Sequence, residues 1–156
     1  MLFRSHGVKR ILYVNGHGGN NPSLGVVINS LKYTYGIDAY YTSMGFGVFD
    51  DQINPELGWS VARGHASETE TSQAMALCPE VVRKDLQKGD VVENFIIRGK
   101  NAPFKYGGIS YQWERDASRN GALGDARLSS LEEGIRLNNV ALERVKRMID
   151  YILEHF

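Results

Sequence analysis

The amino-acid sequence predicts an α/β fold that contains parallel strands joined by a helix. Two patterns predict it: a strand, loop, helix and strand follow one another over residues 10–42, and a long amphipathic helix covers residues 129–154. Of the 156 residues, 42% are hydrophobic and 23% are charged, which is typical of a globular protein. A chain of this length fits one domain, so we expect a single domain over residues 1–156.

The first strand and helix are predicted from residues 10 to 35. Arg10–Asn15 is a short apolar run bounded by glycine, which is typical of a buried strand in a parallel sheet. Asn21 is expected to cap the following helix, with Pro22 at its first position. Apolar residues at helical spacing then predict a helix over residues 22–35: Leu24, Val27, Ile28 and Leu31.

The second strand completes a strand–helix–strand unit. Gly36 is expected to end the helix, and Asp38–Thr42 has the aromatic and β-branched residues that strands favour. Two parallel strands joined by a helix form a right-handed crossover, whose ligand-binding loops lie at the carboxyl ends of the strands. We therefore expect a functional loop directly after Asn15.

The rest of the chain is predicted to contain a long C-terminal helix and several shorter elements between long loops. Ser129-x-x-Glu132 is a capping box, and it is followed by an apolar stripe that predicts a helix to about Glu154. Long loops without periodicity are expected over residues 45–64 and 98–127. Shorter elements are expected between them: a helix over Glu70–Leu77, a further turn over Glu80–Leu86 and a strand over Val91–Ile97.

The charge balance restricts the classes of partner, and the single cysteine restricts the cellular compartment. The 18 Lys and Arg residues equal the 18 Asp and Glu residues, so no net field attracts nucleic acid or an anionic membrane, and neither is expected as a partner. The longest apolar run near the N-terminus, Ile11–Val14, is too short for a signal peptide or a membrane span. Cys78 has no partner for an internal disulfide, which favours the cytoplasm.

A glycine-rich loop with one histidine follows the first strand. Its sequence is Asn15-Gly-His-Gly-Gly-Asn20. A phosphate-binding loop is disfavoured, because the glycine spacing departs from the known phosphate-binding patterns. Two interpretations remain open: His17 is a metal ligand or proton carrier, or it is a histidine that orders a turn.

A second polar cluster lies at residues 64–72. It places His65, Glu68 and Glu70 in one short segment that enters a helix. Imidazole and carboxylate groups are the ligands and the acid–base groups of metal hydrolases. Helix capping accounts equally well for the two glutamates, since acidic residues are favoured in the first turn, but it does not account for His65.

Taken together, these clusters resemble the creatininase family of amidohydrolases. Its members carry N-G-H-G-G-N after a strand and a later segment close to G-H-A-G-E-x-E-T-S, which match residues 15–20 and 64–72. A third stretch, Gly121–Asp125 followed by residues 129–134, resembles the family's G-x-x-G-D-P motif and the helix start after it. The resemblance implies a three-layer α/β/α sandwich around a mostly parallel sheet, and hydrolysis of a small, commonly cyclic amide by two divalent zinc, manganese or iron ions.

The resemblance also implies a role for each site residue. His17 and Glu70 match metal ligands, and His65 matches a histidine that donates a proton to the leaving group. Glu68 is expected to be a second acid–base or pocket residue. Gly19 stands where creatininase has a glutamate ligand, so that ligand is not carried over. Complete family members often form hexamers, so a homo-oligomer acting on a small-molecule substrate is expected.

The match to the family lacks its N-terminal part, which holds an E-x-H metal motif. The chain is therefore expected to begin within the domain and to be inactive, or nearly so, by itself. Two other functions stay open: a ring-opening hydrolase of keto-inositol sugars, as in other family members, and a noncatalytic fragment or subunit that binds a partner. An exposed apolar patch beside the first strand would favour the noncatalytic interpretation.

Overall fold

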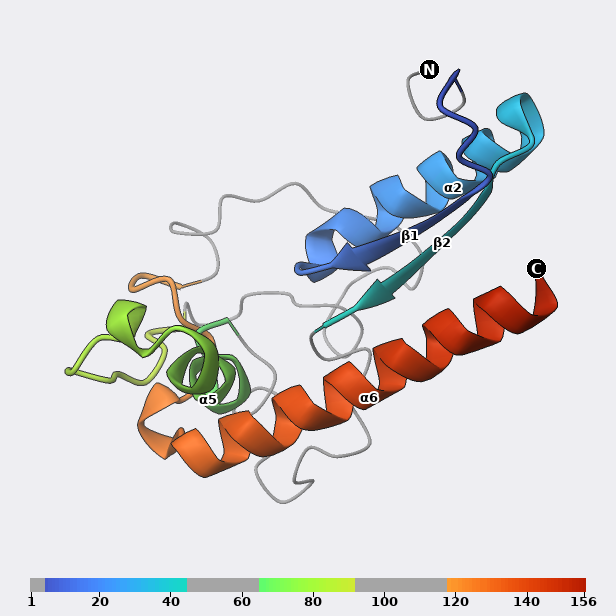
Figure 1. Ribbon diagram of the computed structural model, residues 1–156. Coiled ribbons are helices and arrows are strands. Elements are labelled where there is room, and N and C mark those ends of the chain that lie inside the picture. The colour runs from blue at the N-terminus through green and yellow to red at the C-terminus, as the bar shows by residue number, and fades with distance from the viewer. Residues whose placement is uncertain (1–4, 45–64, 92–117) are drawn as a thin grey trace, which may run out of the picture. The chain divides into compact units, whose positions relative to one another are not determined.

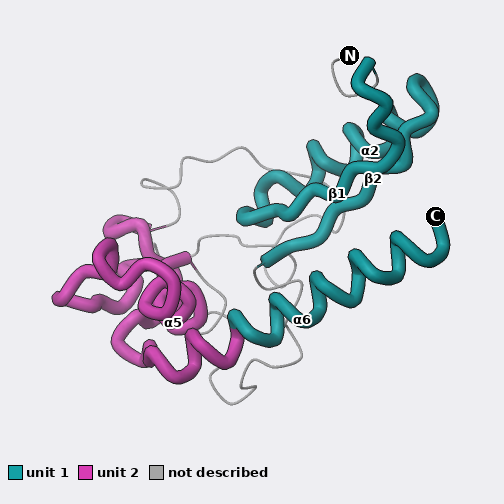
Figure 2. Tube along the Cα trace, viewed as in Figure 1, with its two compact units in different colours: residues 1–52, 138–156 teal, residues 53–137 magenta. Residues whose placement is uncertain are grey.

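The structure of the protein is a computed structural model, which describes residues 5–44, 65–91 and 118–156. It contains two compact units (Figure 2). Unit 1 comprises Met1–Gln52 and Asn138–Phe156, and unit 2 comprises Ile53–Leu137. A single domain over the whole chain stays a prediction.

Unit 1 contains two parallel strands joined by a helix. Strand β1 covers Arg10–Asn15 and β2 covers Asp38–Ser43, and the two pair in register from Arg10 with Asp38 to Asn15 with Ser43. Helix α2, Asn21–Tyr35, connects them (Figure 1). Both predicted strands, their parallel direction and the helix between them are confirmed.

A second helix packs in unit 1 against the strands. Helix α6 covers Leu131–His155, and its residues from Asn138 onward belong to this unit. Arg10 of β1 donates a hydrogen bond to the Ile152 carbonyl oxygen at 3.3 Å, and the Tyr40 and Phe156 rings lie 5.8 Å apart. With α2 and α6 running beside the strands in Figure 1, unit 1 has the helix and parallel-sheet content of the predicted α/β class.

The prediction that β1 is fully buried is wrong. Ile11, Leu12 and Tyr13 are half-buried, and the Val14 side chain is 53% exposed. Within the described residues β1 pairs with β2 alone, so only one of its edges is covered by another strand. An apolar run is therefore compatible with burial but does not by itself supply the neighbours that produce it.

The first helix begins one residue before its predicted start. Asn20, not Asn21, occupies the N-cap position, and its side chain makes no capping hydrogen bond. A 3-10 turn over Gly18–Asn20 leads directly into α2. At the other end Gly36 is left-handed, with a φ of 65°, and its N–H donates to the Lys32 carbonyl oxygen, so the predicted glycine stop is confirmed.

Unit 2 contains a short helix followed by irregular segments. Helix α5 covers Glu68–Leu77 and begins two residues earlier than predicted. The predicted turn over Glu80–Leu86 is wrong beyond Val81, because the 3-10 turn Pro79–Val81 ends where Val82 becomes extended. Val91 forms an antiparallel bridge with Ser118, whereas the rest of the predicted strand and the loop of residues 45–64 lie outside the described residues.

The start of α6 is capped by the second of two adjacent serines. The Ser130 hydroxyl oxygen accepts the Glu133 N–H at 3.1 Å, so the N-cap lies one residue after the predicted Ser129. The Ser130 N–H donates to Ser72 Oγ at 3.0 Å, so the reciprocal bond of the predicted capping box is not formed. Ser129 instead donates its hydroxyl to the Glu68 carbonyl oxygen at 3.1 Å. The end of α6 at His155 agrees with the prediction to one residue. In the described ranges, none of the helices combines the length and apolarity needed to cross a bilayer.

Candidate active site

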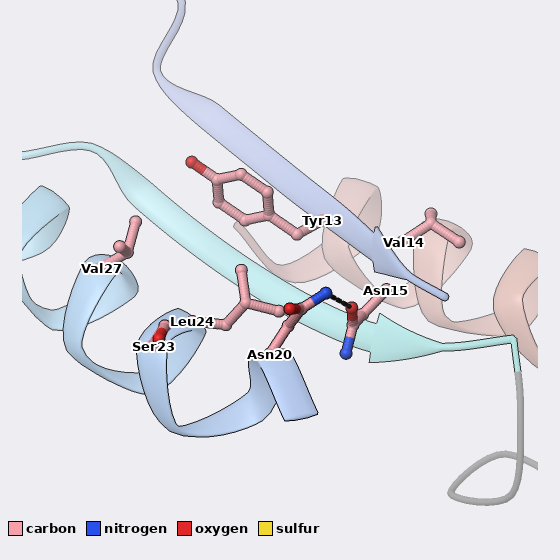
Figure 3. A pocket seen from close by; sticks show the side chains of 7 residues that line it. All are labelled: Tyr13, Val14, Asn15, Asn20, Ser23, Leu24 and Val27. Atoms are coloured by element: carbon pink, nitrogen blue, oxygen red, sulfur yellow. Dashed lines mark hydrogen bonds between the residues drawn. The ribbon is translucent and has the colours of Figure 1, made fainter. Parts of the chain in front are cut away.

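The buried side chain of Asn15 folds the loop that carries His17. Asn15 is only 6% exposed, and its amide nitrogen donates to the His17 carbonyl oxygen at 2.7 Å and to Asn21 Oδ1 at 2.8 Å. Its Oδ1 accepts the His17 N–H at 3.3 Å and Asn20 Nδ2 at 3.1 Å, the last of which is drawn in Figure 3. These four bonds use both donors and both lone pairs of one amide.

This arrangement gives the polar residues of the loop distinct tasks. Asn15 was not a predicted site residue, although its place at the end of a strand and the start of the motif was visible in the sequence. The Asn20 side chain donates to Asn15 and the Asn21 side chain accepts from it, so neither amide caps α2. The loop geometry of His17 therefore depends on one buried residue of β1.

His17 is exposed at the carboxyl end of β1. A side-chain carbon placed on Gly19 would lie 2.8 Å from His17 Nε2, closer than real Cβ contacts, and 3.0 Å from its Cδ2. Gly19 thus leaves room for the imidazole ring. A hollow of about 360 Å³ lies beside the loop, between β1 and α2 (Figure 3). It is lined by Tyr13, Val14, Asn15, Asn20, Ser23, Leu24 and Val27.

Replacing Asn15 with aspartate is expected to destabilise the chain by about 1–3 kcal/mol. The carboxylate keeps the two acceptor positions but loses both donors, so the His17 carbonyl oxygen and Asn21 Oδ1 lose their partner. Asn29→Asp is the matched control, because Asn29 is exposed on α2 and should change stability by no more than about 0.5 kcal/mol. Urea unfolding measures both, and equal effects would show that Asn15 has no special role.

In unit 2, Ser67 and Glu70 cap the start of α5. The Ser67 hydroxyl oxygen accepts the Glu70 N–H at 3.4 Å, and Glu70 Oε2 accepts the Ala66 N–H at 2.9 Å. The hydrogen bond from the Ala66 N–H to Glu70 agrees with the helix-capping interpretation of Glu70. A carboxylate has about four lone-pair sites, so capping and metal ligation by the same group are compatible.

Glu68, the predicted acid–base or pocket residue, is buried. Its side chain is 5% exposed, Thr69 donates to Oε2 at 3.1 Å and Ser72 donates to Oε1 at 3.3 Å. Burial raises the pKa of the Glu68 carboxyl above its ordinary value, and the neighbouring charge of Glu133 adds to this, while the two hydroxyl hydrogen bonds oppose it. A buried carboxyl of this kind holds its proton to higher pH than an exposed one.

The site residues divide between the two units. His65, Glu68 and Glu70 lie together at the start of α5 in unit 2, with His65 half-buried, whereas His17 belongs to unit 1. The convergence of His17 and Glu70 on one ion stays a prediction. Within residues 5–44, 65–91 and 118–156, three or more His, Cys, Asp or Glu side chains do not group as a metal site.

The third sequence motif holds the backbone of His65. Leu123 and Gly124 donate their N–H groups to the His65 carbonyl oxygen at 2.8 and 3.4 Å. Asp125, at the end of the motif, accepts from the Arg127 guanidinium at 2.7 and 2.8 Å, and this bond lowers the pKa of the Asp125 carboxyl. Two motifs separated by about fifty residues in the chain therefore form one structure in unit 2.

Comparison with known proteins places these motifs in a family. The chain is 29% identical over 149 residues to a protein of Mycolicibacterium smegmatis named mycofactocin precursor peptide peptidase. That alignment covers 88% of this chain and 49% of the relative, so the chain spans about half the length of the curated relative it matches.

Solved structures of similar proteins share the fold. A Bacteroides fragilis protein provisionally assigned as a creatinine amidohydrolase has a TM-score of 0.74 at 23% identity, covering 99% of this chain and 58% of that one. A tryptophan-to-phenylalanine mutant of creatininase has a TM-score of 0.62 at 20% identity, covering 95% of this chain and 58% of the mutant. The sequence profile described as creatininase, creatinine amidohydrolase, matches residues 2–149. Since this match covers nearly the whole chain, the protein belongs to the creatininase family.

Proposed function

We propose that this chain carries part of the active site of a metal-dependent hydrolase that cleaves an amide C–N bond. The observation that carries the proposal is the exposed residue His17, whose backbone is held by buried Asn15 in a loop at the carboxyl end of a parallel strand. Parallel α/β sheets collect their ligands at this edge. Membership of the creatininase family supports the same class of reaction.

His17 and Glu70 are the proposed metal ligands. An imidazole nitrogen and a carboxylate oxygen suit zinc, manganese or iron(II), so the chemistry of this donor pair fits the divalent ions that the family resemblance implies. When bound, such ions supply Lewis-acid polarisation of a carbonyl and activation of water. The hydrogen bond from the Ala66 N–H to Glu70 Oε2 would orient the Glu70 carboxylate for this task.

His65 and Glu68 are the proposed proton carriers. A half-buried imidazole near neutral pH can donate a proton to the leaving nitrogen, as general acids do. The raised pKa of Glu68 would let its carboxyl hold a proton closer to neutral pH than an exposed glutamate does. Because Glu68 is bound by two hydroxyl groups inside the protein, its proposed part is to carry a proton rather than to contact bulk solvent.

A small amide is the proposed substrate class. Creatinine amidohydrolase and peptide peptidase are both names for enzymes that hydrolyse an amide bond, and both occur among the similar proteins. Cyclic amides and short peptides are therefore better supported than the keto-inositol sugars of the alternative. We further propose a cytoplasmic homo-oligomer, which fits the single cysteine and the hexamers expected from the family resemblance.

A noncatalytic, partner-binding role is the second candidate. The 53% exposure of Val14, with the half-buried residues before it, is the apolar surface beside the first strand that this interpretation requires. A chain with this role would associate with a partner through β1 and would show no measurable affinity for divalent metal. Metal titration therefore separates the two candidates.

The test is calorimetric titration of the 156-residue chain with zinc and with manganese. Weak binding is expected, because His17 and Glu70 are two ligands where a zinc site uses about three or four. Adding a segment of a full-length relative that carries the E-x-H motif should tighten it. Glu70→Gln keeps an oxygen to accept the Ala66 N–H but loses the negative charge, so it should weaken binding without loosening α5.

One control and a second ligand variant complete this titration. Glu80→Gln removes an acidic charge from the turn Pro79–Val81, outside the proposed site, and should leave binding unchanged. His17→Ala should weaken binding as Glu70→Gln does. Metal affinity that is indifferent to both His17→Ala and Glu70→Gln would refute the ligand assignment.

A further inference from the structure

The peptide group between His65 and Ala66 is held on both of its edges. Its carbonyl oxygen, from His65, accepts the N–H groups of Leu123 and Gly124 at 2.8 and 3.4 Å. Its N–H, from Ala66, donates to Glu70 Oε2 at 2.9 Å. A planar peptide fixed from two sides cannot rotate without losing hydrogen bonds, so these contacts set the direction in which the His65 backbone enters α5.

The next residue shows that this peptide is constrained. Ala66 has a φ of 48°, and in the described parts of the chain it is the one non-glycine residue with a positive φ. This conformation is uncommon for alanine, since its Cβ approaches the backbone. Such residues persist where surrounding contacts over-determine the backbone, and they cluster at functional sites.

Residues 87–90 brace the loop that holds this peptide. Gly89 donates its N–H to the Gly124 carbonyl oxygen at 2.8 Å, and the Gln87 carbonyl oxygen accepts the Ala126 N–H at 3.2 Å. Gly89 also lies so close to the loop that a Cβ there would be 2.3 Å from the Ala122 carbonyl oxygen. The backbone of residues 87–90 packs directly against the backbone of the loop, so a movement of one segment requires a movement of the other.

The Asn120 side chain holds the start of the same loop by hydrogen bonds. Asn120 Oδ1 accepts the Asp90 N–H at 2.9 Å and the Ala122 N–H at 3.2 Å, while Asn120 Nδ2 donates to the Lys88 carbonyl oxygen at 2.9 Å. A single amide thus joins residues 88–90 to the start of the loop. The series of contacts from residues 88–90 through the loop to His65 is continuous.

We infer that Gly89 and Asn120 are positioning residues for His65, which they place through the loop Gly121–Asp125. In this role the third sequence motif, residues 121–125, positions His65 without contacting the substrate. The inference rests on the proposed function for the catalytic role of His65, but the position of His65 is measurable without any activity.

The experiment uses the 156-residue chain labelled at its histidines, whose four imidazole rings give four sets of NMR signals. His65→Asn identifies the His65 signals. In Gly89→Ala the loop must shift, so the His65 ring signals should move and the Leu123 N–H should exchange with solvent at least tenfold faster. Gly25→Ala is the control, since Gly25 has open space around it and lies in unit 1.

A milder variant keeps the test decisive if Gly89→Ala does not fold. Asn120→Asp retains the acceptor oxygen and loses the donor to the Lys88 carbonyl oxygen, so it should produce the same two changes to a smaller degree. A folded variant in which Leu123 exchange accelerates while the His65 signals stay in place would overturn the inference. Failure of metal binding or hydrolysis would instead count against the proposed function. It would not bear on this inference, because the His65 signals are measured without metal or substrate.

Discussion

Gly134→Ala is expected to destabilise the chain by about 3 kcal/mol, although alanine is the better helix former. Gly134 lies in the first turns of α6, where a Cβ would be 1.8 Å from the Ser72 carbonyl oxygen and 3.2 Å from Ala76 Cβ. Because the nearest atom is backbone, α5 and α6 would have to separate. That movement would also break the hydrogen bond from the Ser130 N–H to Ser72 Oγ, which is 3.0 Å long.

Gly25→Ala is the matched control, with the opposite sign. Gly25 is inside α2, and a Cβ there meets nothing within 4 Å. The substitution should therefore stabilise the chain by about 0.8–1 kcal/mol, the difference in helix propensity between the two residues. Urea unfolding followed by circular dichroism measures both variants. If Gly134→Ala also stabilised the protein, the close packing of α5 on α6 would be disproved.

His65→Asn and Glu68→Gln are expected to lower kcat by roughly a hundredfold or more in an intact family member carrying the matching changes. Asparagine cannot donate a proton as imidazolium does, and glutamine cannot exchange one as a carboxyl does. Asp85→Asn is the control, because Asp85 is exposed, lies outside the proposed site and forms an ion pair with exposed Arg83. A rate that is unchanged in Glu68→Gln would remove Glu68 from the mechanism.

Stability separates a catalytic Glu68 from a structural one. Burial raises the pKa of Glu68 in the folded state above its unfolded value, so the folded state binds the proton more tightly. Its contribution to stability is therefore fully present below the unfolded pKa and is lost as the pH rises through the folded pKa. Glu68→Gln carries no such charge and can still accept from Ser72, so at neutral pH it should be at least as stable as the parent chain.

The pH dependence of unfolding is the corresponding measurement. Between about pH 4.5, the ordinary carboxyl pKa, and neutrality, the free energy of unfolding of the parent chain should fall more steeply than that of Glu68→Gln. A variant that loses activity while matching or exceeding the parent in stability indicates a residue kept for function. A large loss of stability at neutral pH would show instead that the carboxylate mainly holds α5 in place.

The elements that the sequence determined by itself are those governed by local periodicity. The strand Arg10–Asn15, the glycine stop at Gly36 and the long C-terminal helix follow from residues that lie next to one another in the chain. Such patterns act through backbone conformation and the spacing of apolar side chains, which need no distant partner to be recognised. The family motifs were visible for the same reason, since each is a short continuous segment.

Tertiary structure decided which of two equivalent neighbours performs a task. Ser130 rather than Ser129 caps α6, because the Ser129 hydroxyl is bound to the carbonyl oxygen of Glu68, 61 residues away. Asn15 binds the side chains of both Asn20 and Asn21, so neither asparagine side chain caps α2, although both residue types favour that position. Adjacent residues of one type have the same propensity, so only a partner from another part of the fold distinguishes them.

Tertiary structure also decided burial and the connections between motifs. Glu68 is enclosed and the apolar strand β1 is half-exposed, the reverse of what their residue types favour, because burial depends on which segments pack nearby. The contact of Leu123 and Gly124 with the His65 carbonyl oxygen joins two motifs that no local pattern relates. Backbone hydrogen bonds of this kind leave no side-chain signature, since any residue but proline can donate them.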